Sequence, residues 1–216
     1  MNIFNVIILI VITLSNISYA HQPEEGKVFG SFGPFVNHTQ SIYTPEANTP
    51  FNPGFGILAE GDLSHHGGIE IGLFVSQKNY KREFGNTGLV MTRVERIEIP
   101  MGYRYWLIPE LSGALEFSSA FSVGDPSILS SNVTGDQSTT ANTVADYGID
   151  FSIQWEFWTN RVFSLLVDGR YTISVSTNPG EDANTYGILV ALKYLIQEKG
   201  QEKPPEKDYD RIKEKL

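Results

Sequence analysis

Residues 147–157 read YGIDFSIQWEF, and this stretch decides the fold. Its large apolar side chains fall on every second residue, from Tyr147 to Phe157, and small or polar residues fill the positions between them. A period of two is typical of a β-strand with one apolar and one polar face, whereas an α-helix repeats every 3.6 residues. The pattern therefore predicts a strand at 147–157.

The same alternation recurs in seven other segments of the chain. They are 28–36, 55–63, 69–75, 97–105, 111–123, 163–173 and 186–194. Eight strands in total is an even number, as in single-chain bacterial barrels, and a tilted strand needs about 9–11 residues to cross a bilayer. The expected fold class is all-β, an eight-stranded antiparallel up-and-down transmembrane β-barrel.

The connections between these segments alternate in length. The long ones are 37–52, 79–90, 124–145 and 175–184, and the short ones are 64–67, 107–109 and 158–160. Alternate connections of an up-and-down barrel lie at the same end, so we expect all long loops on one rim and the short turns, with both termini, on the other. Outer-membrane barrels show this asymmetry, with long loops outside the cell and short turns in the periplasm.

Composition excludes several classes of protein. The chain has 216 residues, no cysteine and a formal net charge of −9. Without cysteine there is no disulfide scaffold, thiol nucleophile or Cys-ligated zinc site. The acidic balance argues against a nucleic-acid partner, which requires clustered Lys and Arg.

The two ends of the chain differ from the middle. Residues 6–14 are an unbroken apolar run, and Ser18 and Ala20 precede a plausible cleavage site, so residues 1–20 are predicted to be a secretory signal peptide. Residues 21–196 would form the barrel. Residues 197–216, QEKGQEKPPEKDYDRIKEKL, have too few apolar side chains to pack a core and are predicted to be a disordered, charged periplasmic tail.

Aromatic residues gather at the ends of the predicted strands. Tyr186 and Tyr194 bracket the last strand, and Tyr103, Tyr105 and Trp106 cluster at the short-turn end of 97–105. Rings at both ends of an apolar band match the aromatic girdles of membrane barrels.

The polar faces carry charges of both signs, which predicts a charge network in the lumen. An eight-stranded lumen is just wide enough for side chains, and buried charges need partners. Asp62 and Lys78 also lie on these faces. The predicted network is Glu60, Glu70, Arg96, Glu98, Arg104, Glu116, Asp150, Glu156, Asp168, Arg170 and Lys193.

Three interpretations of these faces remain open. The lumen is filled by salt-bridged side chains, or it is a narrow pore with an acidic lining; the two differ in whether Arg96, Arg104 and Arg170 pair fully with the acids. Alternatively, the apolar face points inward, as in a soluble lipocalin-like ligand-binding barrel. The Gly, Ala and Ser on the polar faces, the signal peptide and the one-sided long loops favour an outward apolar face.

The histidines do not suggest an enzyme. Some eight-stranded barrels modify lipid A, and such chemistry requires a His beside a Ser on one strand. His21 begins the mature chain, His38 starts a predicted loop, and His65 and His66 lie in a short turn. We therefore predict no catalytic residues, no metal site and no cofactor, and we regard a lipid A-modifying enzyme as the weakest alternative.

Two stretches resemble a known family. Residues 96–106, RIEIPMGYRYW, resemble a middle strand, and residues 185–194, TYGILVALKY, resemble the assembly signal of a last strand, with Thr185, Gly187, Val190 and Leu192 at the matching positions. The chain thus resembles the small outer-membrane β-barrel proteins of OmpA/OmpX type and of the PorT-like outer membrane protein beta-barrel domain. It departs from many of them by continuing past the last strand.

The resemblance implies a place and a set of partners. It implies the bacterial outer membrane, contact with its lipid and lipopolysaccharide, and recognition of the last strand by the barrel-assembly machinery. The role it implies is structural or based on surface interactions, with no partner identified for the outer loops.

Overall fold

The computed structural model describes residues 23–41, 49–84, 88–134, 145–160, 162–176 and 183–197. The predicted signal peptide lies outside these residues, as does the predicted tail apart from Gln197. The strands are β1 (Val28–Ser41), β2 (Asn52–Asp62), β3 (Gly67–Phe84), β4 (Gly88–Ile108), β5 (Leu111–Ser131), β6 (Asp146–Thr159), β7 (Phe163–Ser174) and β8 (Ala183–Gln197).

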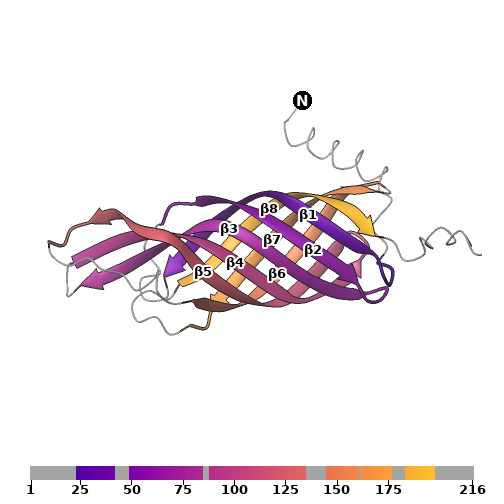
Figure 1. Cartoon of the computed structure of the whole chain (residues 1–216), viewed down its shortest axis with the longest axis horizontal. Helices are drawn as coiled ribbons and strands as arrows, with labels where there is room; N and C mark the ends of the chain where they lie inside the picture. Colours follow the sequence, from indigo (N-terminus) through magenta and orange to yellow (C-terminus); the bar gives the residue numbers. More distant parts are fainter. Residues whose placement is uncertain are drawn as a thin grey trace, which may run out of the picture.

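These strands close into a single barrel (Figure 1). Each strand pairs antiparallel with its neighbours in the chain, and β8 pairs antiparallel with β1. The fold is therefore an all-β, closed, eight-stranded up-and-down barrel, and the predicted fold class is confirmed. Among the residues described, no helix has the length and apolar character to span a membrane.

The long-loop end differs from the prediction. We expected a loop at 79–90, but β3 extends to Phe84 and β4 begins at Gly88. β5 occupies the first part of the predicted loop 124–145. Both predictions were wrong, because these parts of the strands lie beyond the apolar band and carry too little hydrophobic alternation to be recognised. At the other end the connections are short, at 63–66, 109–110 and 160–162.

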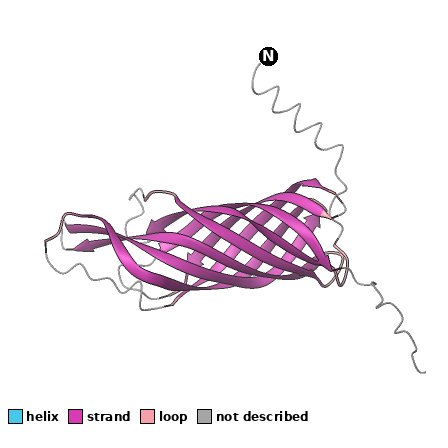
Figure 2. Ribbon diagram, turned by 45° about the horizontal axis from the view of Figure 1, so that its top comes forward, coloured by secondary structure: helices cyan, strands magenta, loops and turns pink. Residues whose placement is uncertain are grey.

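The extra strand length forms a sheet that projects beyond the barrel. β5 pairs with β6 only as far as Ala120, opposite Asp146, but it pairs with β4 as far as Ser131, opposite Val90. Figures 1 and 2 show β3, β4 and β5 continuing past the other strands at one end of the molecule. We call this sheet, formed by 80–84, 88–95 and 122–131, the extension.

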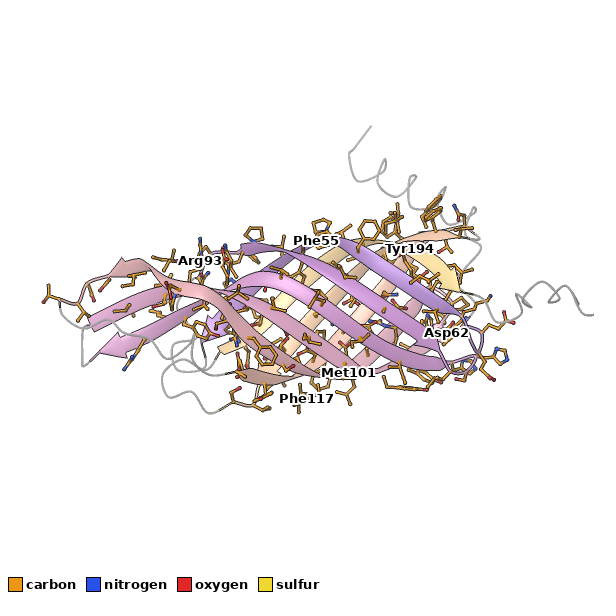
Figure 3. All side chains as sticks on the ribbon, in the orientation of Figure 1. Phe55, Asp62, Arg93, Met101, Phe117 and Tyr194 are labelled. Atoms are coloured by element: carbon orange, nitrogen blue, oxygen red, sulfur yellow. The ribbon has the colours of Figure 1, made fainter. Side chains whose placement is uncertain are left out.

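The apolar side chains point outward, as predicted. Large apolar residues on all eight strands are exposed, and Figure 3 shows such side chains standing out from the wall, among them Phe55 and Phe117. The buried residues, in contrast, are mostly polar or charged. This arrangement is the opposite of a ligand-binding barrel with an apolar interior.

Aromatic rings occur at both ends of this apolar belt, with one exception. Tyr171 and Tyr186 stack with centroids 6.3 Å apart towards the long-loop end, and Trp155 lies 5.9 Å from Phe157 towards the other end. Trp106 does not belong to the outer ring in which we placed it. It is only 3% exposed, because it follows the alternation of β4 into the lumen.

Close packing between strands gives the first testable prediction. A Cβ on Gly102 would lie 2.1 Å from the carbonyl oxygen of Leu115, so β4 and β5 would have to separate. We expect Gly102→Ala to destabilise the barrel by about 3 kcal/mol, measured by urea titration of the folded gel band. Gly113→Ala is the control, because a Cβ there meets only an ordinary contact, 3.5 Å from the oxygen of Ser152. Equal stability of the two variants would contradict the packing described.

Candidate functional site

The charged lumen is the candidate site, and it has three levels. At the short-turn end, Lys193 on β8 donates to Glu60 on β2 at 2.6 Å and to Glu156 on β6 at 2.8 Å. Its Nζ also lies 4.8 Å from the ring centroid of Phe29 and 5.5 Å from that of Trp106. The ammonium group is thus enclosed by two carboxylates and two aromatic faces, a favourable setting for a buried cation.

The middle level is built around Glu70 on β3, which is fully buried. One carboxylate oxygen accepts from Nε of Arg104 at 2.5 Å, and the other accepts from Arg170. Arg104 also bonds Asp168 at 3.0 Å, and Arg170 bonds Glu116 at 2.8 Å. Two guanidinium groups and three carboxylates therefore form one network, which connects β3, β4, β5 and β7 across the lumen.

Hydroxyl groups and an aromatic ring complete this middle network. The two Nη atoms of Arg104 donate to Ser112 at 2.9 Å and to Ser152 at 3.0 Å. The guanidinium of Arg170 lies 4.8 Å from the ring centroid of Phe74. Arginine has five donors in a fixed plane, so bonding several partners at once holds its orientation.

The outer level lies near the long-loop end and centres on Asp146. Lys78 and Arg96 both reach its carboxylate, at 2.7 Å and 2.9 Å. Ser174 and Ser176 donate to the other oxygen, at 3.0 Å and 2.7 Å. Sequence analysis did not single out Asp146, because it falls between the predicted loop 124–145 and the predicted strand 147–157. Its signal was that it lies two and four residues before Gly148 and Asp150, on the same face of β6.

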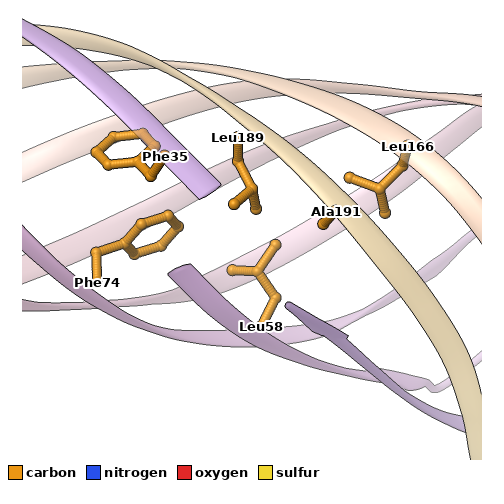
Figure 4. Close-up of a cluster of buried hydrophobic side chains, with 6 residues drawn as sticks. All are labelled: Phe35, Leu58, Phe74, Leu166, Leu189 and Ala191. Atoms are coloured by element: carbon orange, nitrogen blue, oxygen red, sulfur yellow. The ribbon is translucent and has the colours of Figure 1, made fainter. Parts of the chain in front are cut away.

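An apolar cluster fills another part of the lumen (Figure 4). Phe35 and Phe74 meet edge to face, with ring centroids 4.9 Å apart. Sequence reasoning missed this cluster, although isolated large apolar residues on otherwise polar strand faces were its signal. The members are Phe35, Leu58, Phe74, Leu166, Leu189 and Ala191.

Nine of the eleven predicted network residues take part in ion pairs, and two do not. Asp150 accepts from Ser118 at 3.1 Å, and Glu98 makes no ion pair within the described part of the chain. Glu98 lines two small cavities of about 20 and 10 Å³, the larger of which it shares with Lys78 and Arg96. Such volumes hold about one or two water molecules.

The described histidines lie on the barrel's outer surface or in a turn. His38 lies between Phe51 and Tyr186, with ring centroids 5.0 and 5.1 Å away. His65 is 3.3 Å from the carbonyl oxygen of Pro23, and His66 stacks on Tyr105. Within the described ranges, no three His, Asp or Glu residues are grouped so as to hold a metal ion.

Comparison with known proteins supports the fold alone. No family model and no curated relative matches the chain. The outer membrane protein OprG of Pseudomonas aeruginosa is similar in structure, with a TM-score of 0.52 and 7% identity over 83% of this chain and 99% of that chain. So low an identity supports a shared architecture and gives no information on activity.

Two further solved structures are similar at lower scores. Ail, the attachment invasion locus protein of Yersinia pestis, solved with the heparin analogue sucrose octasulfate, gives a TM-score of 0.49 and 11% identity over 80% of this chain and 99% of that chain. The outer membrane protein AlkL in DMPC bilayers gives a TM-score of 0.41 and 10% identity over 86% of this chain and 96% of that chain.

The enclosure of Lys193 leads to a second prediction. Lys193→Met leaves Glu60 and Glu156 buried without their cation, so we expect a loss of about 3–5 kcal/mol in the free energy of unfolding. Lys193→Met combined with Glu60→Gln and Glu156→Gln should recover most of this loss. The control is Lys27→Met, because Lys27 pairs with the exposed Glu24 at 2.9 Å and such pairs contribute little. A single Lys193 variant as stable as the control would show that the lumen is not packed as described.

Proposed function

We propose that this protein is a closed, non-conducting outer-membrane barrel of the bacterial envelope, with a structural and surface-interaction role. The observation that carries the proposal is the pairing of Arg96, Arg104 and Arg170 with lumen acids. Sequence analysis gave the pairing of these three arginines with the acids as the criterion that separates a filled lumen from an acidic pore. The outward apolar belt and the similarity in fold to OprG support the membrane setting.

The orientation that we propose rests on where the long connections lie. We propose that the extension and the long loops are extracellular, and that the short turns and both termini are periplasmic, as in outer-membrane barrels in general. The belt would contact outer-membrane lipid and lipopolysaccharide, and β8 would be recognised by the barrel-assembly machinery.

The extension is the part of the molecule best suited to an interaction role. Within the described residues, the pairing of β5 with β6 ends at Ala120, opposite Asp146. A strand edge that continues past its neighbour can pair with another polypeptide through N–H and C=O groups. Ile128 and Leu129 are exposed on the same strand, so the edge also offers apolar side chains.

Conductance distinguishes this proposal from the pore alternative. Purified, refolded protein should show a heat-dependent shift in gel mobility, and expressed protein should fractionate with the outer membrane. The same preparation should give no channel events in planar bilayers at high protein load. Regular single-channel steps from heat-shifted protein would contradict the closed lumen and favour the pore.

We also propose that the protein has no catalytic role. No described histidine lies on the lumen face of a strand or bonds a serine hydroxyl through its ring. Expression of the protein should therefore leave the mass of lipid A unchanged. A mass shift that disappears in His65→Ala/His66→Ala would overturn this proposal.

A further inference from the structure

The middle level of the lumen contains one acid more than it contains cations. Its three carboxyl groups and two guanidinium groups are those of Glu70, Glu116 and Asp168, and of Arg104 and Arg170. All five side chains are buried. A buried charge without a counter-charge is costly, so the excess carboxyl group needs a positive charge from another source.

Arg170 brings two of these carboxyl groups together. Its Nη1 donates to Oε2 of Glu116 at 2.8 Å, and its Nη2 donates to Oε1 of Glu70. Because both Nη atoms belong to one planar guanidinium group, the two carboxyl groups lie side by side, within hydrogen-bonding reach of each other. An ionised carboxylate is only an acceptor, so a hydrogen bond between the two requires a proton on one of them.

The partners of the two groups indicate which one carries this proton. Both oxygens of Glu70 already accept, one from Arg104 at 2.5 Å and the other from Arg170. In Glu116 only Oε2 accepts, and Oε1 is buried without a donor among the described residues. The Glu116 side chain therefore has the oxygen that is free to hold a proton.

The surroundings of Glu116 also favour a neutral side chain. Asp150 lies directly opposite Glu116 in the ladder between β5 and β6, and both residues are buried in the lumen. Like charges at opposite positions destabilise a sheet. The charged groups around Glu70 and Glu116 are Glu60 on β2, Glu98 and Arg104 on β4, Asp150 on β6, and Asp168 and Arg170 on β7.

We propose that Glu116 holds a proton and donates it to Glu70, which makes the middle level of the lumen a proton-binding site. The proton supplies the positive charge that the two guanidinium groups leave missing. The stability of the closed barrel then depends on pH through this one site. The inference rests on the closed lumen proposed above and adds a bound proton to it.

The pH dependence has a definite sign. In the unfolded chain, a glutamate releases its proton above about pH 4.3, whereas the folded barrel keeps the shared proton. Folding thus takes up a proton at neutral pH, and the contribution of this site to stability falls as the pH rises. Carboxylates that are simply ion-paired have the opposite effect, because they lose stability in acid.

Two glutamine variants test the assignment, because they make the same change on either side of the proton. Glu116→Gln keeps a neutral donor beside Glu70, so its urea midpoint should equal that of the wild type at about pH 6 and exceed it at about pH 9. Glu70→Gln weakens the acceptor that two arginines share, so its midpoint should be lower at both pH values. The control is Glu24→Gln at the exposed rim, which should follow the wild-type profile.

Two results of this titration would overturn the proposal. One is a Glu116→Gln variant that loses as much stability as Glu70→Gln, as expected if Glu116 is an ionised partner of Arg170. The other is a Glu116→Gln variant whose midpoint changes with pH as that of the wild type does.

Infrared spectroscopy detects the proton itself. The spectrum of refolded wild-type protein in lipid vesicles at about pH 7, minus that of Glu116→Gln, should contain the C=O stretch of a neutral carboxylic acid. A difference spectrum without this band would overturn the proposal. Because conductance and the heat-dependent mobility shift report the closed barrel separately, a missing band does not bear on the proposed closed barrel.

Discussion

Replacing Glu70 with alanine is expected to cost about 3–5 kcal/mol of folding free energy. Glu70 is fully buried and accepts hydrogen bonds from both Arg104 and Arg170. Its removal leaves two guanidinium groups with fewer anions in a site closed to water. The expected result is a lower urea midpoint for the conversion of the folded gel band.

The size of this effect depends on burial, and a surface acid provides the control. Glu24→Ala removes a carboxylate whose partner is Lys27 at the short-turn rim, and no measurable change is expected. Replacing Glu70, Arg104 and Arg170 together with apolar residues should cost less than Glu70→Ala alone, because no uncompensated charge then remains. If Glu70→Ala matches Glu24→Ala in stability, the network does not close the lumen.

Phe151→Arg is expected to destabilise the inserted barrel by about 2–4 kcal/mol. Phe151 occupies the middle of the outward face of β6, between Ile149 and Ile153, so the charge would lie near the centre of the bilayer. The free energy of unfolding in lipid vesicles measures the cost.

Depth provides the control for this second prediction. Leu107→Arg places the same charge on an exposed side chain at the short-turn end of β4, where the expected cost is about 0–1 kcal/mol. A variant Phe151→Arg that folds as well as Leu107→Arg would mean that the apolar belt does not lie in lipid.

The sequence was sufficient to predict the strands wherever one of their two faces is apolar. The period of two in 147–157 and its counterparts predicted eight strands. The outward apolar face was inferred from the small residues on the polar faces, the predicted signal peptide and the one-sided long loops. The period of two was insufficient for the extension, because charged residues such as Lys81, Arg82 and Arg93 interrupt the apolar alternation there. Alternation identifies a strand only where one of its faces is consistently apolar.

The residues of the candidate site could be predicted from the sequence, but the ion pairs between them could not. Parity along each strand identifies which charges enter the lumen, including Lys193 and Glu60. It does not identify their partners, because a pair such as Arg170 and Glu70 is separated by 100 residues and meets only when the barrel closes. The apolar cluster around Phe74 was missed for the same reason, since its members come from five strands.

Fluorescence quenching in brominated lipid tests the central claim most directly, namely that the apolar face meets lipid around a packed lumen. Trp155 is 48% exposed on the outer face, whereas Trp106 is 3% exposed in the lumen. Variants that retain one of these tryptophans, with the other tryptophans replaced by phenylalanine, would be refolded into vesicles with brominated acyl chains. The account predicts strong quenching of Trp155 and little quenching of Trp106. Quenching of Trp106 with protection of Trp155 would contradict it.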